Sequence, residues 1–466
     1  MRWGRFVAAI AAAGVLAAAV VVARDAWALP ATYVLGAVVA TAAVAVLLTV
    51  YGVDACAAGL LVAAVGTTTW NAVALGGLKP AAGLLAVSLL LFAGLAVLDR
   101  RRVSVPPWVW VLGGAILLIV AVHLVWPTDI SYLAARYVSG YSYSAAELAG
   151  SDLSGAATGV QWLVATVALP VTVCLAAARR PGLPLVLADA WVAGSAVSAA
   201  VALTDELGVT DISASLIAAV DVGGRQSGLS VQPNHLAVAA ALTVPLALWR
   251  ALRGGRPVLM WASVAVLAGG LFVAESRGGL VIAVVACLVV VLADRRARGA
   301  LPIVAGLGLA TLVVVVSSVP GLLTGLAEQL RLSGADSAAE SDAIRERIGL
   351  QALYDFLHDP VRGVGLEVAV QGHNIYLQLL ASGGVLLLAG FVIAQAGFLL
   401  DARTLRAVTG GLSAALALST ATWLVVGIVE NHLTDLFLYV PFALVAGLRA
   451  AHAVTPIPTE IESAPR

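Results

Sequence analysis

Long apolar stretches alternate with short polar segments along almost the whole chain. A stretch of about 18 to 25 apolar residues can cross a hydrocarbon core of roughly 30 Å as a helix. This pattern predicts about 14 transmembrane helices in an all-α, polytopic integral membrane protein. The helices are expected at residues 6–23, 31–50, 55–75, 81–98, 107–126, 158–178, 185–203, 232–249, 257–275, 278–293, 301–319, 374–400, 407–429 and 436–450.

Composition agrees with this pattern, because 61% of the 466 residues are hydrophobic and only 11% are charged. The apolar run at 6–23 has no clear small-residue cleavage site after it, so it is expected to be a retained helix. Cys56, Cys174 and Cys287 lie within apolar runs. They are therefore expected to be buried hydrophobic residues and not disulfide partners or metal ligands.

The placement of arginine predicts the orientation, since basic residues in short loops stay on the cytoplasmic side. With Arg2 and Arg5 inside, every strongly basic loop also falls inside. These loops are DRRR at 99–102, RRPG at 179–182, RALRGGR at 250–256, DRRARG at 294–299 and DARTLR at 401–406. Both termini are then cytoplasmic, and the tail 451–466 is expected to be disordered.

The same orientation places three long loops outside, at 127–157, 204–231 and 320–372. The tyrosines of the first loop suit either stacking on sugar rings or an ordinary interfacial aromatic belt. The third loop contains DSAAESDAIRERIGLQALYDFLHDP. This segment predicts an amphipathic helix on the membrane surface, with Ile344, Ile348, Leu353 and Phe356 among its apolar residues.

Polar residues gather at a few points on the predicted outer side. The segment from Arg345 to Gly384 carries several arginines and ends its polar part with His373 and Asn374. Glu275 and Arg277 lie in the turn AESRGGL, either as a local pair or as functional groups, because charges near lipid need partners. Glu430, Asn431, His432 and Asp435 form a further cluster before the last helix. These segments are interpreted as the rim of an active site.

Four motifs in order, RQSGLSVQPNHLA, SRGGL, HDPVRGVGL and GHNIYLQLLASGG, carry a family resemblance. Together they resemble the O-antigen ligase and O-antigen polymerase superfamily of membrane glycosyltransferases, over roughly residues 185–450. Such enzymes use a glycan on a polyprenyl diphosphate carrier. The resemblance thus implies glycan transfer from that donor to a glycan, lipid or protein acceptor on the extracytoplasmic face of the bacterial cytoplasmic membrane.

The resemblance also implies roles for individual residues. His373 corresponds to the family's catalytic histidine, Arg277 to its outer-face arginine, and Arg345 to the arginine upstream of its DP-x-x-G-x-G segment. Arg347 is a rival for that last position, since Gly349 stands where many members carry Trp. Arg225 resembles the arginine that precedes the helix containing Pro-Asn.

The chemistry of these residue types suits such a reaction. Guanidinium groups bind phosphate oxygens in a planar, bidentate manner and stay charged. His373 could accept the proton of an acceptor hydroxyl as a general base, and Asn374 could hold the imidazole or the start of the next helix. Arg225, Arg347, Asn374 and Glu430 are candidate substrate-binding residues.

No cofactor or metal is expected, because the outer loops contain no Asp-x-Asp pair and arginines occupy the motif positions. The alternative is a metal site formed by Glu275, Glu430 and Asp435.

Three regions organise the chain in this interpretation: 1–157 with N-terminal helices, 158–450 with the catalytic helices and the 320–372 loop, and the tail. A lipid or solute transporter is the alternative function, although its binding groups should lie near the midplane. Asp189 is the clearest acidic residue inside a predicted span. A structural scaffold is a third possibility, but it would not need arginines and a histidine on one side.

Overall fold

The structure is a computed structural model. It describes residues 51–74, 79–129, 132, 151–215, 225–254, 256–294, 297–298, 336–366, 373–430 and 432–454. The predicted helices at 6–23, 31–50 and 301–319 lie outside these residues, as do most of the loop 127–157 and most of the tail.

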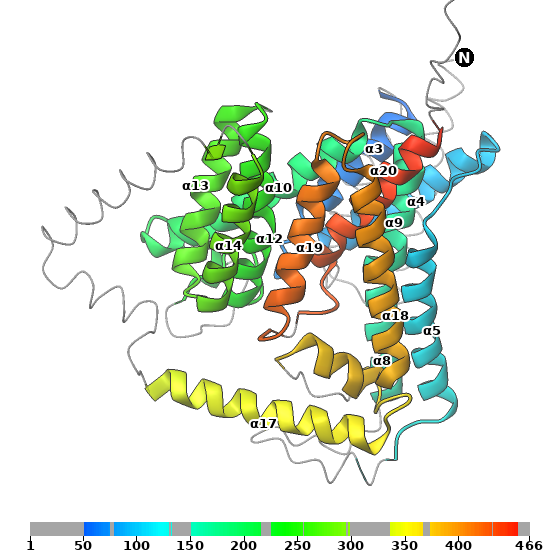
Figure 1. Ribbon diagram of the computed structural model, residues 1–466, viewed down its shortest axis with the longest axis vertical. Coiled ribbons are helices and arrows are strands. Elements are labelled where there is room, and N and C mark those ends of the chain that lie inside the picture. The colour runs from blue at the N-terminus through cyan, green and yellow to red at the C-terminus, as the bar shows by residue number, and fades with distance from the viewer. Residues whose placement is uncertain are drawn as a thin grey trace, which may run out of the picture.

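Every regular element in the described ranges is a helix (Figure 1). The helices are α3 (Val53–Gly66), α4 (Pro80–Leu98), α5 (Pro107–Val125), α8 (Ser151–Leu163), η1 (Val164–Ala168), α9 (Leu169–Arg179), α10 (Leu183–Glu206), α11 (Ile212–Ser215), α12 (Pro233–Leu252), α13 (Pro257–Val273), α14 (Arg277–Ala293), α17 (Asp336–His358), α18 (Ile375–Leu405), α19 (Leu412–Val426), η2 (Leu436–Tyr439) and α20 (Val440–Val454). The all-α prediction is therefore confirmed for this part of the chain.

Seven of the described helical segments are long and apolar enough to cross a membrane. They are Pro80–Leu98, Pro107–Val125, Gly155–Arg179, Leu183–Glu206, Pro233–Leu252, Ile375–Leu405 and Leu436–Ala453. Four further apolar helices, α3, α13, α14 and α19, match predicted spans but are shorter than 18 residues. The described residues therefore contain seven helices that meet the length for a membrane span, compared with about 14 predicted for the whole chain.

The predicted helix at 374–400 differs from the structure, because α18 is broken at Gly384. Its backbone there has φ 60° and ψ −160°, which is not helical. The amide of Val385 instead bonds to the carbonyl of Pro360 at 2.9 Å, and the amide of Val364 bonds to the carbonyl of Ala381 at 2.8 Å. The segment around Gly363 therefore forms the backbone hydrogen bonds at the break. A short first half of α18 runs across the bundle before the long second half (Figure 1).

The helices share one apolar core that extends through both predicted transmembrane regions. The N-terminal helices α3, α4 and α5 pack against α10, α9 and α18, respectively. Core residues accordingly come from both sides of residue 157, such as Leu61, Ile116, Trp191 and Phe391. The motif-bearing helices are therefore held in place by the N-terminal ones.

The basic segments predicted to be cytoplasmic are tied together by ion pairs at helix ends. Arg179 bonds to Asp54 at 2.9 Å and also pairs with Asp99. The Nε and Nη2 atoms of Arg250 each donate to a carboxylate oxygen of Asp189 at 2.7 Å. Asp189, the one acidic residue noted inside a span, therefore has a bidentate structural partner.

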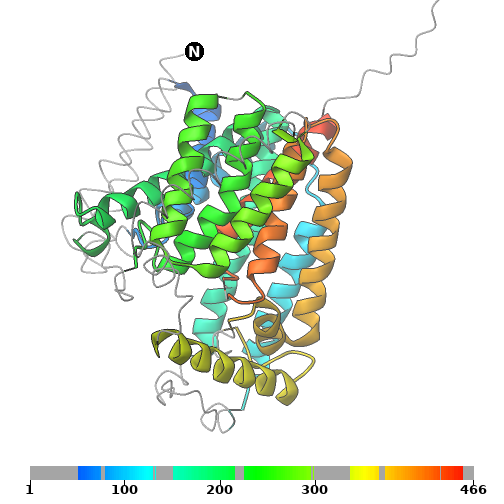
Figure 2. The ribbon, with the colours of Figure 1, turned by 60° about the vertical axis from the view of Figure 1, so that its left-hand side comes forward.

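Helix α17 lies across the opposite end of the bundle (Figures 1 and 2). It buries Ile348 and Ala352 and packs on α18. Its opposite face exposes Leu353, Tyr354 and Leu357. The structure has a helix at Asp336–His358, but Leu353, one of its predicted apolar residues, lies on the exposed face. An amphipathic helix on a membrane surface stays a prediction.

Candidate functional site

The motif residues meet at the end of the bundle that α17 covers. The helices α12, α14 and α18 all begin there, and α19 ends there. The amide of Ile375 bonds to the carbonyl of Gly427 at 2.7 Å, which joins the start of α18 to the end of α19. Polar residues that flank these helix ends are consequently brought together from distant parts of the chain.

Arg225 is anchored in this region by three hydrogen bonds. Its Nε and Nη2 atoms donate to the carbonyl of Ala274 at 3.0 and 2.8 Å, and Nη2 also donates to Oδ1 of Asn234 at 2.7 Å. Ala274 precedes the turn that leads into α14, and Asn234 lies in the first turn of α12. Arg225 therefore fixes these two helix starts relative to each other.

Glu430 continues this chain of contacts. The Nδ2 atom of Asn234 donates to both carboxylate oxygens of Glu430, at 3.2 and 3.3 Å. Glu430 is only 7% exposed. Burial raises the pKa of its carboxyl, while the positive charges of Arg345 and Arg225 and the Asn234 hydrogen bond oppose that rise. The carboxyl therefore lies within the field of two arginines.

His373 occupies an unusual backbone conformation directly before α18. Its φ angle is 44°, in the left-handed region that costs a non-glycine residue about 1 to 3 kcal/mol. Its Nδ1 atom is buried and has no hydrogen-bond partner among the described residues. Burial and the charge of Arg345 lower the pKa of the imidazole. Both effects favour the neutral form of His373, whose buried Nδ1 has an unused hydrogen-bonding capacity among the described residues.

The two rival arginines of the third loop lie differently. Arg345 is half-buried in α17 and acts electrostatically on both His373 and Glu430. Arg347 is exposed. The structure therefore brings Arg345 and not Arg347 to the candidate site.

The other two predicted residues lie at helix starts. Arg277 is the first residue of α14 and is half-buried, and the next residue, Gly278, lies against Val429. Arg277 is thus positioned beside the segment that carries Glu430. The Oδ1 atom of Asn374 accepts hydrogen bonds from the amides of Tyr376 and Leu377 at 2.9 and 3.1 Å, so Asn374 caps α18.

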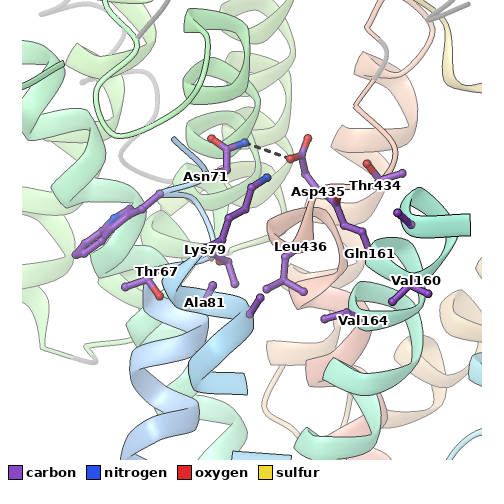
Figure 3. Close-up of a pocket in the computed structure, with 14 residues that line it drawn as sticks. Thr67, Asn71, Lys79, Ala81, Val160, Gln161, Val164, Thr434, Asp435 and Leu436 are labelled. Carbon is purple, nitrogen blue, oxygen red and sulfur yellow. Dashed lines mark hydrogen bonds between the residues drawn. The ribbon is translucent and has the colours of Figure 1, made fainter. Parts of the chain in front are cut away.

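A second polar group adjoins this site and includes Asn71, a residue that the sequence did not single out. Its Nδ2 atom donates to Asp435 Oδ1 at 3.2 Å (Figure 3) and to His235 Nδ1 at 2.6 Å. Its Oδ1 atom accepts from the amide of Val231 at 3.0 Å. Asn71 lies inside the predicted span 55–75, but α3 ends at Gly66 and leaves Asn71 in the segment that follows it. No recognised motif contains Asn71.

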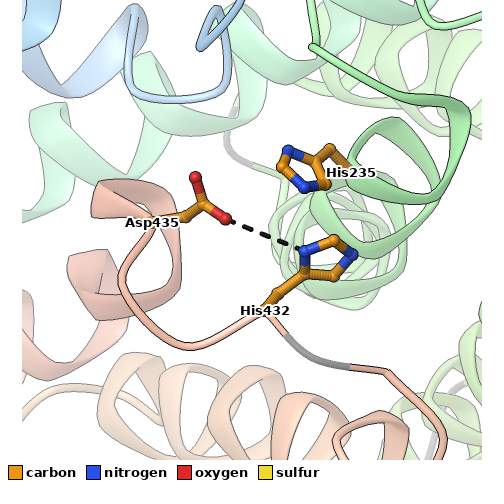
Figure 4. Close-up of side chains that lie close together, drawn as sticks. All are labelled: His235, His432 and Asp435. Carbon is orange, nitrogen blue, oxygen red and sulfur yellow. Dashed lines mark ion pairs between the residues drawn. The ribbon is translucent and has the colours of Figure 1, made fainter. Parts of the chain in front are cut away.

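His235, His432 and Asp435 are of metal-ligand types and offer donor atoms within 4.8 Å of one another (Figure 4). However, Asn71 Nδ2 can only donate, so Nδ1 of His235 must accept that bond. In a neutral imidazole the proton then lies on Nε2, and no lone pair remains for a metal. His235 is therefore held by the hydrogen bond from Asn71, and metal independence stays a prediction.

His432 connects the two polar groups. Its Nε2 atom lies 3.8 Å from Glu430, and its Nδ1 atom lies 3.8 Å from Asp435. Burial lowers the pKa of His432 to about 3, helped by the neighbouring His235, so the ring is neutral near pH 7. His432 therefore lies between Glu430 and Asp435 as a neutral ring, near one carboxylate on each side.

No protein-family model and no curated protein matches this chain. The functional interpretation therefore rests on the residues of the site and on the motif resemblance.

Proposed function

We propose that the chain is a membrane glycosyltransferase that moves a glycan from a polyprenyl diphosphate carrier to an acceptor hydroxyl. One observation carries the proposal: Arg225, Arg345, Glu430 and His373 come from four separate segments and converge at one end of an apolar helical bundle. A carrier lipid and a charged diphosphate need this combination of an apolar body and a cationic rim.

Positive charge from two sources supports binding of the diphosphate. The guanidinium groups of Arg277 and Arg345 suit bidentate contacts with phosphate oxygens. Arg225, whose Nε and Nη2 atoms donate to Ala274 and Asn234, contributes its positive charge. The N-termini of α12 and α14 open toward the same region, and the positive end of a helix dipole stabilises an anion. These groups bind the donor and stabilise the charge on the leaving diphosphate.

His373 acts as the general base in this proposal. Its neutral imidazole takes the proton of the acceptor hydroxyl while that oxygen bonds to the anomeric carbon of the glycan. The bond between the anomeric carbon and the diphosphate oxygen breaks, and the polyprenyl diphosphate leaves with the electron pair. The acceptor is a glycan, lipid or protein hydroxyl. Glu430 holds Asn234 and offsets the charge of Arg345.

The site is assigned to the extracytoplasmic face of a bacterial cytoplasmic membrane. Support comes from the arrangement of ion-paired arginines such as Arg179 and Arg250 at the end of the bundle remote from α17. The donor chemistry agrees, because glycans on polyprenyl carriers are used where the carrier presents them outside the cell.

The experiment uses purified protein in lipid vesicles with a polyprenyl diphosphate-linked glycan and a matching acceptor. Mass spectrometry should detect a new glycosidic product and free polyprenyl diphosphate in equal amounts, and exhaustive chelation should not stop the reaction. A lipid or solute transporter, the alternative, would move donor or solute across the vesicle membrane and leave every glycosidic bond intact.

A further inference from the structure

A pocket of about 600 Å³ lies beside the candidate site, between the α3–α4 turn, the α8–η1 helix and the residues before η2 (Figure 3). Its lining mixes polar and apolar side chains. It comprises Thr67, Thr68, Trp70, Asn71, Lys79, Ala81, Ala82, Ala157, Val160, Gln161, Val164, Thr434, Asp435 and Leu436. The volume suits one or two sugar rings better than a single ion.

The polar groups of the pocket both donate and accept hydrogen bonds. Lys79 offers an ammonium group, Asp435 a carboxylate, and Gln161 an amide that can do either. A carboxylate in the wall opposes binding of a phosphate group, while the remaining lining is mostly apolar with a few polar groups that can fix the orientation of a ligand. A neutral polyhydroxylated ligand is the class that uses all of these groups.

Trp70 is also among the lining residues. Its indole Nε1 donates to the carbonyl of Gly194 at 2.9 Å, so the ring is fixed in position. A rigid aromatic ring beside hydrogen-bonding groups provides contact area for the apolar face of a sugar at a small entropic cost.

Lys79 is the single lysine of the chain and is exposed. Its side chain extends toward Asn71 and Asp435 in Figure 3, and its charge contributes to lowering the pKa of Asp435. Within the described structure, no carboxylate forms an ion pair with it. Its ammonium group is thus available to a ligand.

We propose that this pocket binds a sugar unit of the acceptor, remote from the hydroxyl that reacts. Asp435 lines the pocket and lies near Nδ1 of His432, whereas Glu430 lies near Nε2. The pocket is therefore separated by His432 from the place assigned to the donor diphosphate. The inference rests on the proposed function, which supplies the need for an acceptor glycan.

The experiment exploits the single lysine. Purified protein is treated with an amine-selective acylating reagent, and peptide mass spectrometry follows modification of Lys79 over time. The probes are methyl glycosides of hexoses, N-acetylhexosamines and 6-deoxyhexoses, with glycerol and inorganic phosphate as controls. At least one glycoside should slow acylation of Lys79 in a saturable manner, and neither control should do so.

Two variants test whether the protection comes from this pocket. Gln161→Leu changes an exposed side chain, and Asp435→Asn keeps the shape of the acceptor group. Each removes about one hydrogen bond and should raise the glycoside concentration for half-protection about fivefold. Glu346→Gln, an exposed change on α17, should leave it unaltered. Unchanged thermal unfolding in detergent shows that the variants are folded, and each half-protection concentration is compared with the acylation rate of the same variant without sugar, because Asp435 and Lys79 interact.

Three results overturn the inference: no glycoside protects better than glycerol, phosphate protects as well as any glycoside, or both variants keep full protection. Because no donor is present, the result is independent of transfer. An active enzyme without protection rejects the pocket alone, whereas protection in a protein that transfers nothing supports a sugar site and contradicts the proposed function.

Discussion

The Nη2 atom of Arg225 donates a 2.7 Å hydrogen bond to Oδ1 of Asn234, which lies nine positions further along the chain. The same amide then donates through Nδ2 to Glu430. Asn234 therefore links the guanidinium group of Arg225 to the buried carboxylate of Glu430.

Asn234→Leu should destabilise the protein and Glu430→Gln should reduce that cost. The leucine removes the donor from a buried carboxylate, which costs about 1 to 3 kcal/mol. A neutral glutamine at position 430 carries no charge that needs compensation, so the double variant should lose less than the sum of the single losses. Thermal unfolding in detergent measures the four proteins. Additivity within about 0.5 kcal/mol would show that the two residues are not coupled.

Arg345→Ala and Arg347→Ala form a matched pair on one helix. Loss of a charge-assisted contact from Arg345 should weaken polyprenyl diphosphate binding about tenfold or more. Arg347 is exposed, so its loss should change binding by less than about twofold. Arg345→Lys should rescue poorly, because an ammonium group lacks the bidentate fork. Equal effects of the two alanine variants would contradict the placement of Arg345.

Arg345→Gln should shift the pH dependence of transfer. Burial and Arg345 both lower the pKa of His373, so the wild-type base is available below the ordinary histidine pKa. Removing the charge leaves only burial, raises that pKa and moves the acidic limb of log(kcat/KM) to higher pH. Glu430 and His432 are further titratable groups that face this region. Glu430→Gln therefore shows how far the loss of a neighbouring carboxylate alone moves the acidic limb. An unmoved acidic limb in Arg345→Gln would exclude His373 as the titrating base.

Gly384→Ala should cost at least about 2 kcal/mol of stability, since a left-handed conformation is unfavourable for alanine. A Cβ atom there would also lie 2.3 Å from the Val361 carbonyl. Gly94→Ala is the control, because its Cβ would meet nothing within 4 Å inside α4. It should be neutral or stabilise the helix by up to about 1 kcal/mol. Equal unfolding temperatures for the two variants would contradict the close packing of the Pro360–Val361 backbone against Gly384 at the break in α18.

Apolar run length predicted where most described helices lie, because burial in lipid or in the core requires continuous apolar surface. It could not predict the break in α18. Hydropathy does not change at Gly384, and the break depends on backbone bonds from the distant residues Pro360 and Val361. Similarly, α19 begins only at Leu412 within its apolar run, because Gly410 and Gly411 before it have positive φ angles.

The predicted orientation put Arg225, Arg345, His373 and Glu430 on one outer side of the chain, and the structure places them at one end of the bundle. The choice between Arg345 and Arg347 needed the orientation of α17, which spacing alone does not give. The position of Asn71 beside Asp435 depends on a contact between segments hundreds of residues apart. Such contacts have no local pattern in the sequence.

The most direct measurement compares wild type with His373→Ala in a single turnover of polyprenyl diphosphate-linked glycan, with carrier binding followed in parallel. A general base acts on the acceptor proton, so the variant should lose about 100-fold or more in transfer rate while it binds the carrier as the wild type does. Near-normal transfer by folded His373→Ala protein would contradict the central claim that this histidine performs the proton transfer.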